Sequence, residues 1–130
     1  MTPKSRFELL QKYITDDDVE VEIDESYYDY AKIPHHQRII NGSAGVDSHI
    51  ILYKDSKDTN YNMLSSMLIH EYGHVIKWRE NDDKNHTEKS AWIAGINSIP
   101  IQLRPPTLKE DVILCLKTYD YKNFSWLSSI

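Results

Sequence analysis

The feature that most restricts the fold of this chain is a long helical segment, from Tyr61 to about Arg79, that carries two histidines on one side. His70 and His74 are four residues apart and enclose Glu71 in an H-E-x-x-H arrangement. Residues four apart on a helix lie one turn above each other, so both imidazoles can face one metal ion. The residues that form the apolar stripe of this helix are Tyr61, Leu64, Met67, Leu68, Glu71, Val75 and Trp78. The two histidines border that stripe, and we expect them at the edge of the core.

Two residues of the motif are costly in a helix unless they serve packing or chemistry. Glu71 falls on the apolar stripe, where an ionised carboxylate is unfavourable unless a partner compensates it. Gly73 in mid-helix costs about 1 kcal/mol relative to alanine, which predicts close packing against another element. A glutamate beside two metal ligands is suited to act as a general base.

A catalytic zinc site needs a third protein ligand and an open position for water. Glu88 is the best candidate because it opens the next predicted helix, and a carboxylate there adds one negative charge to two neutral imidazoles. His86 is the rival, and it would make the site all-histidine. Asp82 and Asp83 are weaker candidates because they belong to a polar linker, and the sequence alone leaves the choice open. Trp92, four residues after Glu88, is expected to pack in the core beneath the site.

The remaining helices follow from apolar spacing and from helix-breaking residues. A first amphipathic helix is predicted from Pro3 to Ile14, since proline suits a first helical turn. Another is predicted from Thr87 to about Ser98, before Pro100. The last is predicted from Leu108 to about Tyr119. With the motif helix, this makes about four helices.

Two strands are predicted, with an irregular segment between them. Val19–Ile23 alternates apolar and acidic residues, which is typical of a strand with one face in water. Within Val46–Tyr53, a β-branched run predicts a buried strand. The segment 24–41 has no clear period, and Asn41–Gly45 is interpreted as a turn. The fold class predicted is therefore α+β, with about four helices and a small sheet.

Length and charge limit the classes of protein that the chain can represent. At 130 residues, we expect one compact domain over 1–130. A net charge of -5 without a Lys/Arg cluster argues against nucleic acid as a direct partner. Charges within Met1–Tyr13 exclude the apolar core of a signal peptide, and no segment approaches the roughly 18 apolar residues of a membrane span. Cys115 is the single cysteine, and its apolar surroundings predict a buried, reduced thiol. We therefore expect a cytoplasmic protein.

The motif and the segments around it carry a resemblance to a known family. A buried strand precedes the helix with His70-Glu71-Tyr72-Gly73-His74, and a short polar connection leads to Glu88-x-x-Ala91 and then to Ile99-Pro100. Over roughly 46–100, this combination resembles the ImmA/IrrE group of small gluzincin metallopeptidases. The resemblance implies a zincin-like fold and Zn²⁺ bound by His70, His74 and Glu88, with Glu71 as general acid and base.

These observations predict a zinc-dependent peptidase. Its partner would be a specific protein or peptide, because so small an enzyme has little room for an enclosed specificity pocket. Two alternatives are kept: a metallopeptidase-like protein that acts by binding a protein partner, and a hydrolase of non-peptide amides. Two imidazoles and a carboxylate also accommodate iron, cobalt or manganese. The many Ile, Asn, Lys and Tyr residues suggest an AT-rich bacterial or phage genome.

The sequence does not single out the donor that would stabilise the negatively charged oxygen of a reaction intermediate. Nine tyrosines are available, as are four histidines outside the motif. His35-His36 lies in a polar segment and is expected to be solvated.

Overall fold

The computed structural model describes residues 1–57, 60–81 and 83–130, so Asp82, one of the weaker ligand candidates, lies outside the described residues. Within them, the chain has an α+β fold of five α-helices and a three-stranded sheet, as predicted, with one helix more than expected. The elements in chain order are α1 (Pro3–Thr15), β1 (Glu20–Asp24), α2 (Tyr27–Tyr30), the 3₁₀ turn η1 (His35–Gln37), β2 (Asn41–Ala44), β3 (His49–Tyr53), α3 (Tyr61–Arg79), the turn η2 (Asp83–Asn85), α4 (Glu88–Asn97), the turn η3 (Ile101–Leu103), α5 (Leu108–Lys117) and the turn η4 (Ser125–Ser129).

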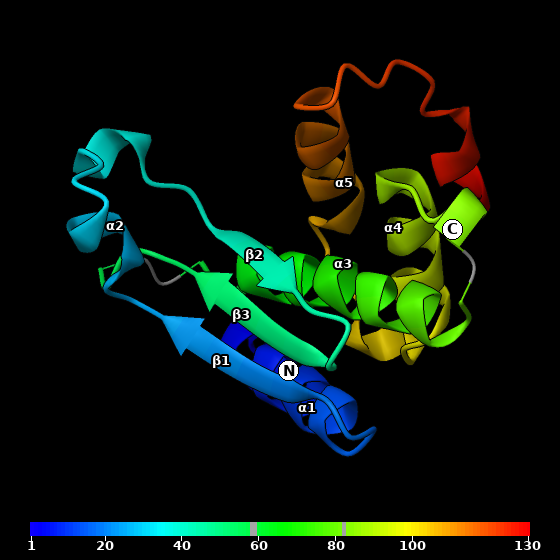
Figure 1. Cartoon of the computed structure of the whole chain (residues 1–130), viewed down its shortest axis with the longest axis horizontal. Helices are drawn as coiled ribbons and strands as arrows, with labels where there is room; N and C mark the ends of the chain where they lie inside the picture. The colour runs from blue at the N-terminus through cyan, green and yellow to red at the C-terminus, as the bar shows by residue number, and fades with distance from the viewer. Residues whose placement is uncertain (58–59, 82) are drawn as a thin grey trace.

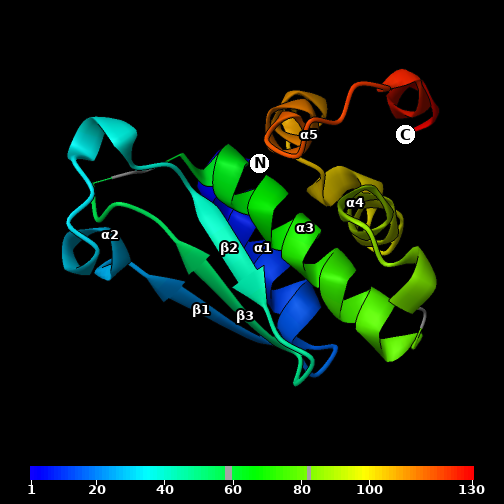
Figure 2. The same ribbon diagram turned by 45° about the horizontal axis from the view of Figure 1, so that its top comes forward.

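Helix α3 occupies the middle of the molecule (Figure 1). The sheet and α1 lie on one side of it, and α4 and α5 lie on the other (Figure 2). The middle of the predicted apolar stripe of α3 is buried, because Leu64, Leu68 and Val75 are almost completely shielded from solvent, whereas Tyr61 and Trp78 at its ends are half-buried. The motif residues therefore sit where three layers of the fold meet.

The sheet has the order β1-β3-β2. β1 pairs in parallel with β3, in a register that aligns Val21 with Ile50, whereas β2 pairs antiparallel with β3. Ile50 and Leu52 point into the core, and the alternate residues of β1 and β3 form the open face, where Glu22 and His49 lie 3.3 Å apart. The predicted strand with one wet face is thus confirmed, and β2 is an edge strand.

The interpretation of Asn41–Gly45 as a turn is wrong, because Asn41–Ala44 forms β2. Small polar residues and glycine are typical of turns, but here the strand is stabilised by pairing with β3, which sequence spacing alone does not reveal. The segment 24–41 is mostly irregular, as expected, apart from the single helical turn α2 and the 3₁₀ turn η1.

The ends of the helices that frame the site are fixed by capping side chains. Asn60 caps α3 by accepting a hydrogen bond from the Met63 N–H at 3.1 Å. Thr87 and Ser90 form a reciprocal capping box at the start of α4, with hydrogen bonds of 2.8 and 3.0 Å. Glu88 is consequently the first residue of α4, and its backbone position is defined by this cap.

Hydrogen bonds to Asp17 tie the motif helix to the end of α1. The carboxylate of Asp17 accepts from the Tyr72 hydroxyl at 2.7 Å and from the Arg79 guanidinium at 2.6 Å. These bonds hold the pKa of Asp17 below its ordinary value. Among the described residues, no helix is both long enough and apolar enough to cross a membrane.

Candidate metal centre

The side chains of His70, His74 and Glu88 converge at the junction of α3 and α4. One carboxylate oxygen of Glu88, Oε2, lies 3.0 Å from Nε2 of His70 and 2.7 Å from Nε2 of His74. The two imidazole rings have centroids 4.7 Å apart, as expected for residues one helical turn apart. Three possible metal-ligand atoms from two helices therefore point at one small region.

A close approach of α3 and α4 brings Glu88 to the histidines. A Cβ atom on Gly73 would lie 1.7 Å from the carbonyl oxygen of Ala91, and one on Gly95 would lie 2.1 Å from the carbonyl oxygen of Ile69. Only glycine fits at either position, because backbone occupies the space of a side chain. The prediction that Gly73 packs closely is confirmed, whereas Gly95, its counterpart on α4, was not singled out from the sequence.

The ring of His70 is held by stacking. It lies parallel to the buried indole of Trp92, with centroids 4.4 Å apart and an interplanar angle of 21°. Trp92 is fully buried, so the prediction that it packs beneath the site is confirmed. Within the described part of the chain, Nδ1 of His70 has no hydrogen-bond partner, so the stack on Trp92 and the contact of Nε2 with Glu88 orient this ring.

The ring of His74 is held by a hydrogen bond on its other nitrogen. Nδ1 of His74 lies 2.7 Å from Nε2 of His86, while Nε2 of His74 faces Glu88. His86 therefore contacts the far side of the His74 ring and not the point where the ligand atoms meet. Second-sphere contacts of this kind fix the tautomer and orientation of a metal-binding histidine. This geometry favours Glu88 over His86 as the third ligand.

Glu71 lies beside this cluster and packs under strand β2. A Cβ atom on Gly42 would be 2.8 Å from Cγ of Glu71, so the missing side chain of Gly42 provides the space that Glu71 occupies. The potential ligand atoms of His70, Glu71 and His74 all lie within 4.8 Å of one another, so the Glu71 carboxylate is near both imidazoles. Glu88 contacts Nε2 of both histidines through one oxygen, and Glu71 lies beside them.

Burial and charge set the protonation of these groups. Burial lowers the pKa of His70, which favours the neutral imidazole that binds metals. Burial would raise the pKa of Glu88, but hydrogen bonds from His70 and His74 outweigh it and hold the pKa below its ordinary range. Burial raises the pKa of Glu71 to about 7. A carboxyl group with such a pKa can accept and release a proton near neutrality.

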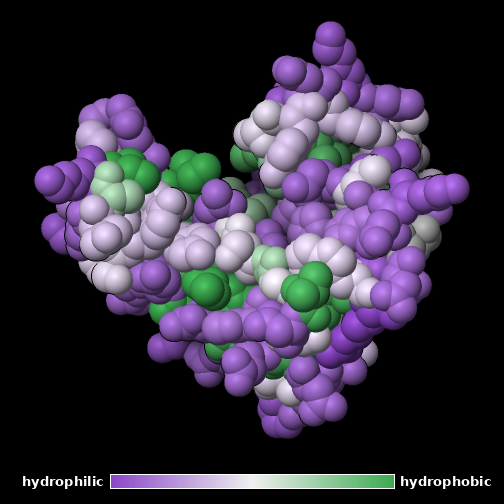
Figure 3. Space-filling view, in the orientation of Figure 1, coloured by the Kyte–Doolittle hydropathy of each residue, from purple (hydrophilic) through white to green (hydrophobic). Residues whose placement is uncertain are grey.

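The cluster opens into a cavity of about 640 Å³. Its walls include all four residues of β2 together with residues of α3, α4 and α5. The face of the molecule seen in Figure 3 is hollowed between the part of the chain around α2 and helix α5. Tyr119 lines the cavity, and burial together with the Glu88 carboxylate raises the pKa of its hydroxyl to about 12. Its hydroxyl is thus a neutral donor at the site, which the sequence did not distinguish among nine tyrosines.

The donor set fits a zinc ion. Two imidazole nitrogens and one carboxylate oxygen form a common ligand set of catalytic zinc sites. Ligands at about 2.0–2.1 Å from a tetrahedral ion are roughly 3.3 Å apart, and the contacts of 2.7 and 3.0 Å between Glu88 and the histidines are only slightly shorter. Small side-chain movements would therefore be sufficient to bind the ion.

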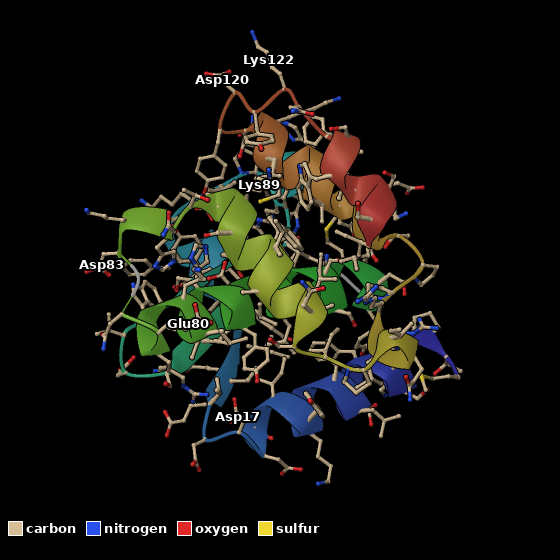
Figure 4. The ribbon with its side chains drawn as sticks, turned by 90° about the vertical axis from the view of Figure 1, so that its right-hand side faces the viewer. Asp17, Glu80, Asp83, Lys89, Asp120 and Lys122 are labelled. Atoms are coloured by element: carbon tan, nitrogen blue, oxygen red, sulfur yellow. The ribbon has the colours of Figure 1, made fainter. Side chains whose placement is uncertain are left out.

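The other residues considered from the sequence lie elsewhere. Asp83 is on the connection between α3 and α4, at the outer edge of the molecule in Figure 4 and at the rim of the cavity. His35 pairs with Asp55 at 2.6 Å, and neither His35 nor His36 lines the cavity. Cys115 is half-buried, not fully buried as expected, and burial raises the pKa of its thiol to about 11. A thiol of this pKa is protonated near neutrality and is a poor nucleophile.

A family model described as "Predicted Zn-dependent protease (DUF2268)" matches residues 4–90. The matched range contains His70, Glu71, His74 and Glu88, and it ends before α5. No curated protein and no solved structure matches the chain.

Proposed function

Because the chain belongs to the DUF2268 family of predicted Zn-dependent proteases, we propose that it hydrolyses peptide bonds of a protein substrate with one Zn²⁺ bound by His70, His74 and Glu88. The observation that carries the proposal is the position of Glu88, whose single oxygen Oε2 contacts Nε2 of both histidines. The adjacent Glu71 supports catalysis, because it is buried and its carboxylate lies within 4.8 Å of the ligand atoms of both histidines, where a general base could reach a metal-bound water.

Glu71 acts as general base and then as general acid. A zinc ion in this site supplies a Lewis acid that polarises a peptide carbonyl and acidifies a water molecule. Glu71 takes one proton from the attacking water as its oxygen bonds to the carbonyl carbon. The carbon–nitrogen bond then breaks, and Glu71 delivers that proton to the departing amine. In the metal-free protein, burial raises the pKa of Glu71 to about 7, so the carboxyl group is a stronger proton acceptor than an exposed one.

Tyr119 is the donor that we propose for the negatively charged oxygen of the reacting carbonyl. It lines the same cavity as Glu71 and Glu88. With a pKa raised to about 12, it remains protonated and can donate a hydrogen bond throughout the reaction.

The edge strand β2 supports a peptide as the substrate. β2 pairs with β3 along one side, and all four of its residues line the cavity. An extended peptide can add to such an edge through backbone hydrogen bonds. The N–H of Gly42 donates to the side chain of Asn41 at 2.8 Å, a bond that a substrate carbonyl could replace. The peptide backbone would thus lie across the residues that carry the chemistry.

Replacing Gly42 by alanine tests whether β2 positions Glu71. The added methyl group would overlap Cγ of Glu71 and push the carboxylate aside. We expect kcat on a cleaved peptide to fall by about tenfold to a hundredfold, with zinc content unchanged. The matched control is Gly45→Ala, whose Cβ would meet the exposed carboxylate of Asp47. Wild-type kcat in Gly42→Ala would show that Glu71 does not depend on this contact.

Removal and return of the metal test the proposed function as a whole. Dialysis against a chelator should abolish peptide cleavage, and one equivalent of Zn²⁺ should restore it. The melting temperature should fall and recover in parallel, because an ion that binds only the folded state stabilises it. Cleavage that persists in protein shown to be free of metal would refute a metallopeptidase.

The proposal of a particular group within the zinc proteases is based on the sequence. Glu88 and Ala91 on α4 support a likeness to the ImmA/IrrE group within the zinc-protease class. We propose by the same likeness that the substrate is a specific cytoplasmic protein.

A further inference from the structure

A second hollow adjoins the cavity of the metal centre. It has a volume of about 460 Å³ and shares Asn41, Met67, Cys115 and Tyr119 with that cavity. Its apolar lining comes from the chain just before β2, from α3, and from α5 and the turn after it. It consists of Ile39, Ile40, Met63, Met67, Leu114 and Tyr119. We name these six residues the apolar pocket. Hydrophobic residues are visible on both sides of the hollow in Figure 3.

The polar groups in the pocket lining do not offer a charge to a ligand. The Asp111 carboxylate accepts hydrogen bonds from Ser66 at 2.6 Å and from Thr107 at 2.8 Å, and it is buried. Cys115 carries a protonated thiol, which behaves as a small apolar group. A ligand for this space is therefore apolar.

Three members of the pocket are exposed more than is usual for large apolar side chains. Ile39 is 64%, Leu114 is 60% and Tyr119 is 57% exposed. They come from both walls of one hollow and are not scattered over the surface. Exposed apolar groups gathered in a cavity beside a reactive centre are typical of a site that receives an apolar side chain.

The direction of β2 indicates which part of a substrate reaches the pocket. Ile39, Ile40 and Asn41 line the pocket, so it lies at the N-terminal end of β2, whereas Gly42, Ser43 and Ala44 line the metal cavity. A peptide that pairs antiparallel with β2, the more stable arrangement, runs from Ala44 towards Asn41. The residues that follow the scissile bond therefore lie nearest to the pocket.

We propose that the apolar pocket receives a large aliphatic or aromatic side chain of the substrate on the C-terminal side of the scissile bond, and that Ile39 and Leu114 select it. This inference rests on the proposed peptidase function. The continuity of the two cavities is the reason for choosing a substrate side chain as the occupant over a second copy of the chain.

Zinc-loaded protein and a series of short peptide hydroxamates provide the test. The hydroxamate group at the N-terminal end binds zinc, so the peptide covers only the C-terminal side of the site. The first side chain of the peptide is isobutyl, methyl or carboxymethyl, and calorimetry gives each dissociation constant. We expect the isobutyl compound to bind at least about tenfold more tightly than the methyl compound, because additional carbon atoms are buried. The carboxymethyl compound should bind most weakly.

Two variants and a control locate the effect. In Leu114→Lys and in Ile39→Lys, the preference for isobutyl over methyl should fall to about threefold or less, since a charge then stands at the pocket mouth. Both residues are exposed, so the fold should be retained, which circular dichroism checks. Ile101→Lys is the matched control, because Ile101 is 72% exposed and lies outside the pocket. It should keep the wild-type preference.

Each contrary result has a distinct meaning. Equal binding of the isobutyl and methyl compounds by wild-type protein overturns the pocket inference and leaves the peptidase proposal standing. An unchanged preference for the isobutyl compound in both Leu114→Lys and Ile39→Lys also overturns the pocket inference. So does analytical sedimentation that shows wild-type protein as a dimer and either variant as a monomer, because the pocket would then be a contact between two copies of the chain. Failure of every hydroxamate to bind protein that holds one zinc per chain contradicts the proposed active site itself, and with it the inference.

Discussion

Replacement of Glu71 by glutamine is expected to abolish peptide cleavage while zinc content and fold are retained. Glutamine has nearly the same size, so it fits the space beneath Gly42, but it cannot accept a proton from water. General-base catalysis contributes about 10²–10⁴-fold to rate, and kcat should fall by at least that factor. Zinc analysis and circular dichroism should match wild type, since Glu71 is not assigned as a ligand.

The same variant has a stability signature that depends on pH. The folded pKa of Glu71 is raised from 4.5 to about 7, so the folded state binds this proton more tightly than the unfolded state. The contribution of Glu71 to the free energy of unfolding is therefore fully present below about pH 4.5, and it is lost as the pH rises through about 7. In chelator-treated protein, the melting temperature of Glu71→Gln relative to wild type should increase across this window. A constant difference would show that Glu71 is not desolvated as the structure indicates.

Replacement of Glu88 by alanine is expected to empty the metal site. Its Oε2 contacts both histidines, so its loss removes one of three ligands and the only negative charge in the assigned ligand set. Zinc affinity should fall by more than the roughly 10–100-fold that loss of a second-sphere contact costs. Competition with a fluorescent chelator measures this affinity, and the increase in melting temperature on zinc addition should disappear with it.

His86→Ala is the matched comparison, because His86 contacts Nδ1 of His74 and not Nε2. Its zinc affinity should fall by about 10–100-fold at most. X-ray absorption at the zinc edge counts the imidazole ligands directly. Two imidazoles support the assignment of Glu88, whereas three imidazoles, with full zinc content in Glu88→Ala, would make His86 the third ligand.

The sequence predicted the parts of the site that depend on local spacing. His70, Glu71 and His74 are related by helical geometry, and Glu88 stands in the first turn of the next predicted helix. Gly73 could be flagged because glycine is costly in mid-helix. These features concern single helices, whose period and ends are encoded in neighbouring residues.

The parts that the sequence did not predict depend on contacts between distant segments. Gly42 was assigned to a turn because its neighbours are small and polar, and its role is apparent only where Glu71 packs against it. Gly95 matters because Ile69 of another helix occupies its side-chain space. Tyr119 and Leu114 reach the site through the packing of α5 beside α3. The spacing of apolar residues within one helix or strand does not show which distant segment packs against it.

The most direct test of the central claim is a count of new peptide N-termini by mass spectrometry. Zinc-loaded wild-type protein and zinc-loaded Glu71→Gln are each incubated with a library of peptides derived from a bacterial proteome. We predict new N-termini with wild type and none above background with Glu71→Gln, although both proteins hold one zinc per chain. Equal numbers in the two samples would show that Glu71 is not the base. No new N-termini with fully zinc-loaded wild type would contradict peptide hydrolysis and favour a protein that acts by binding a partner.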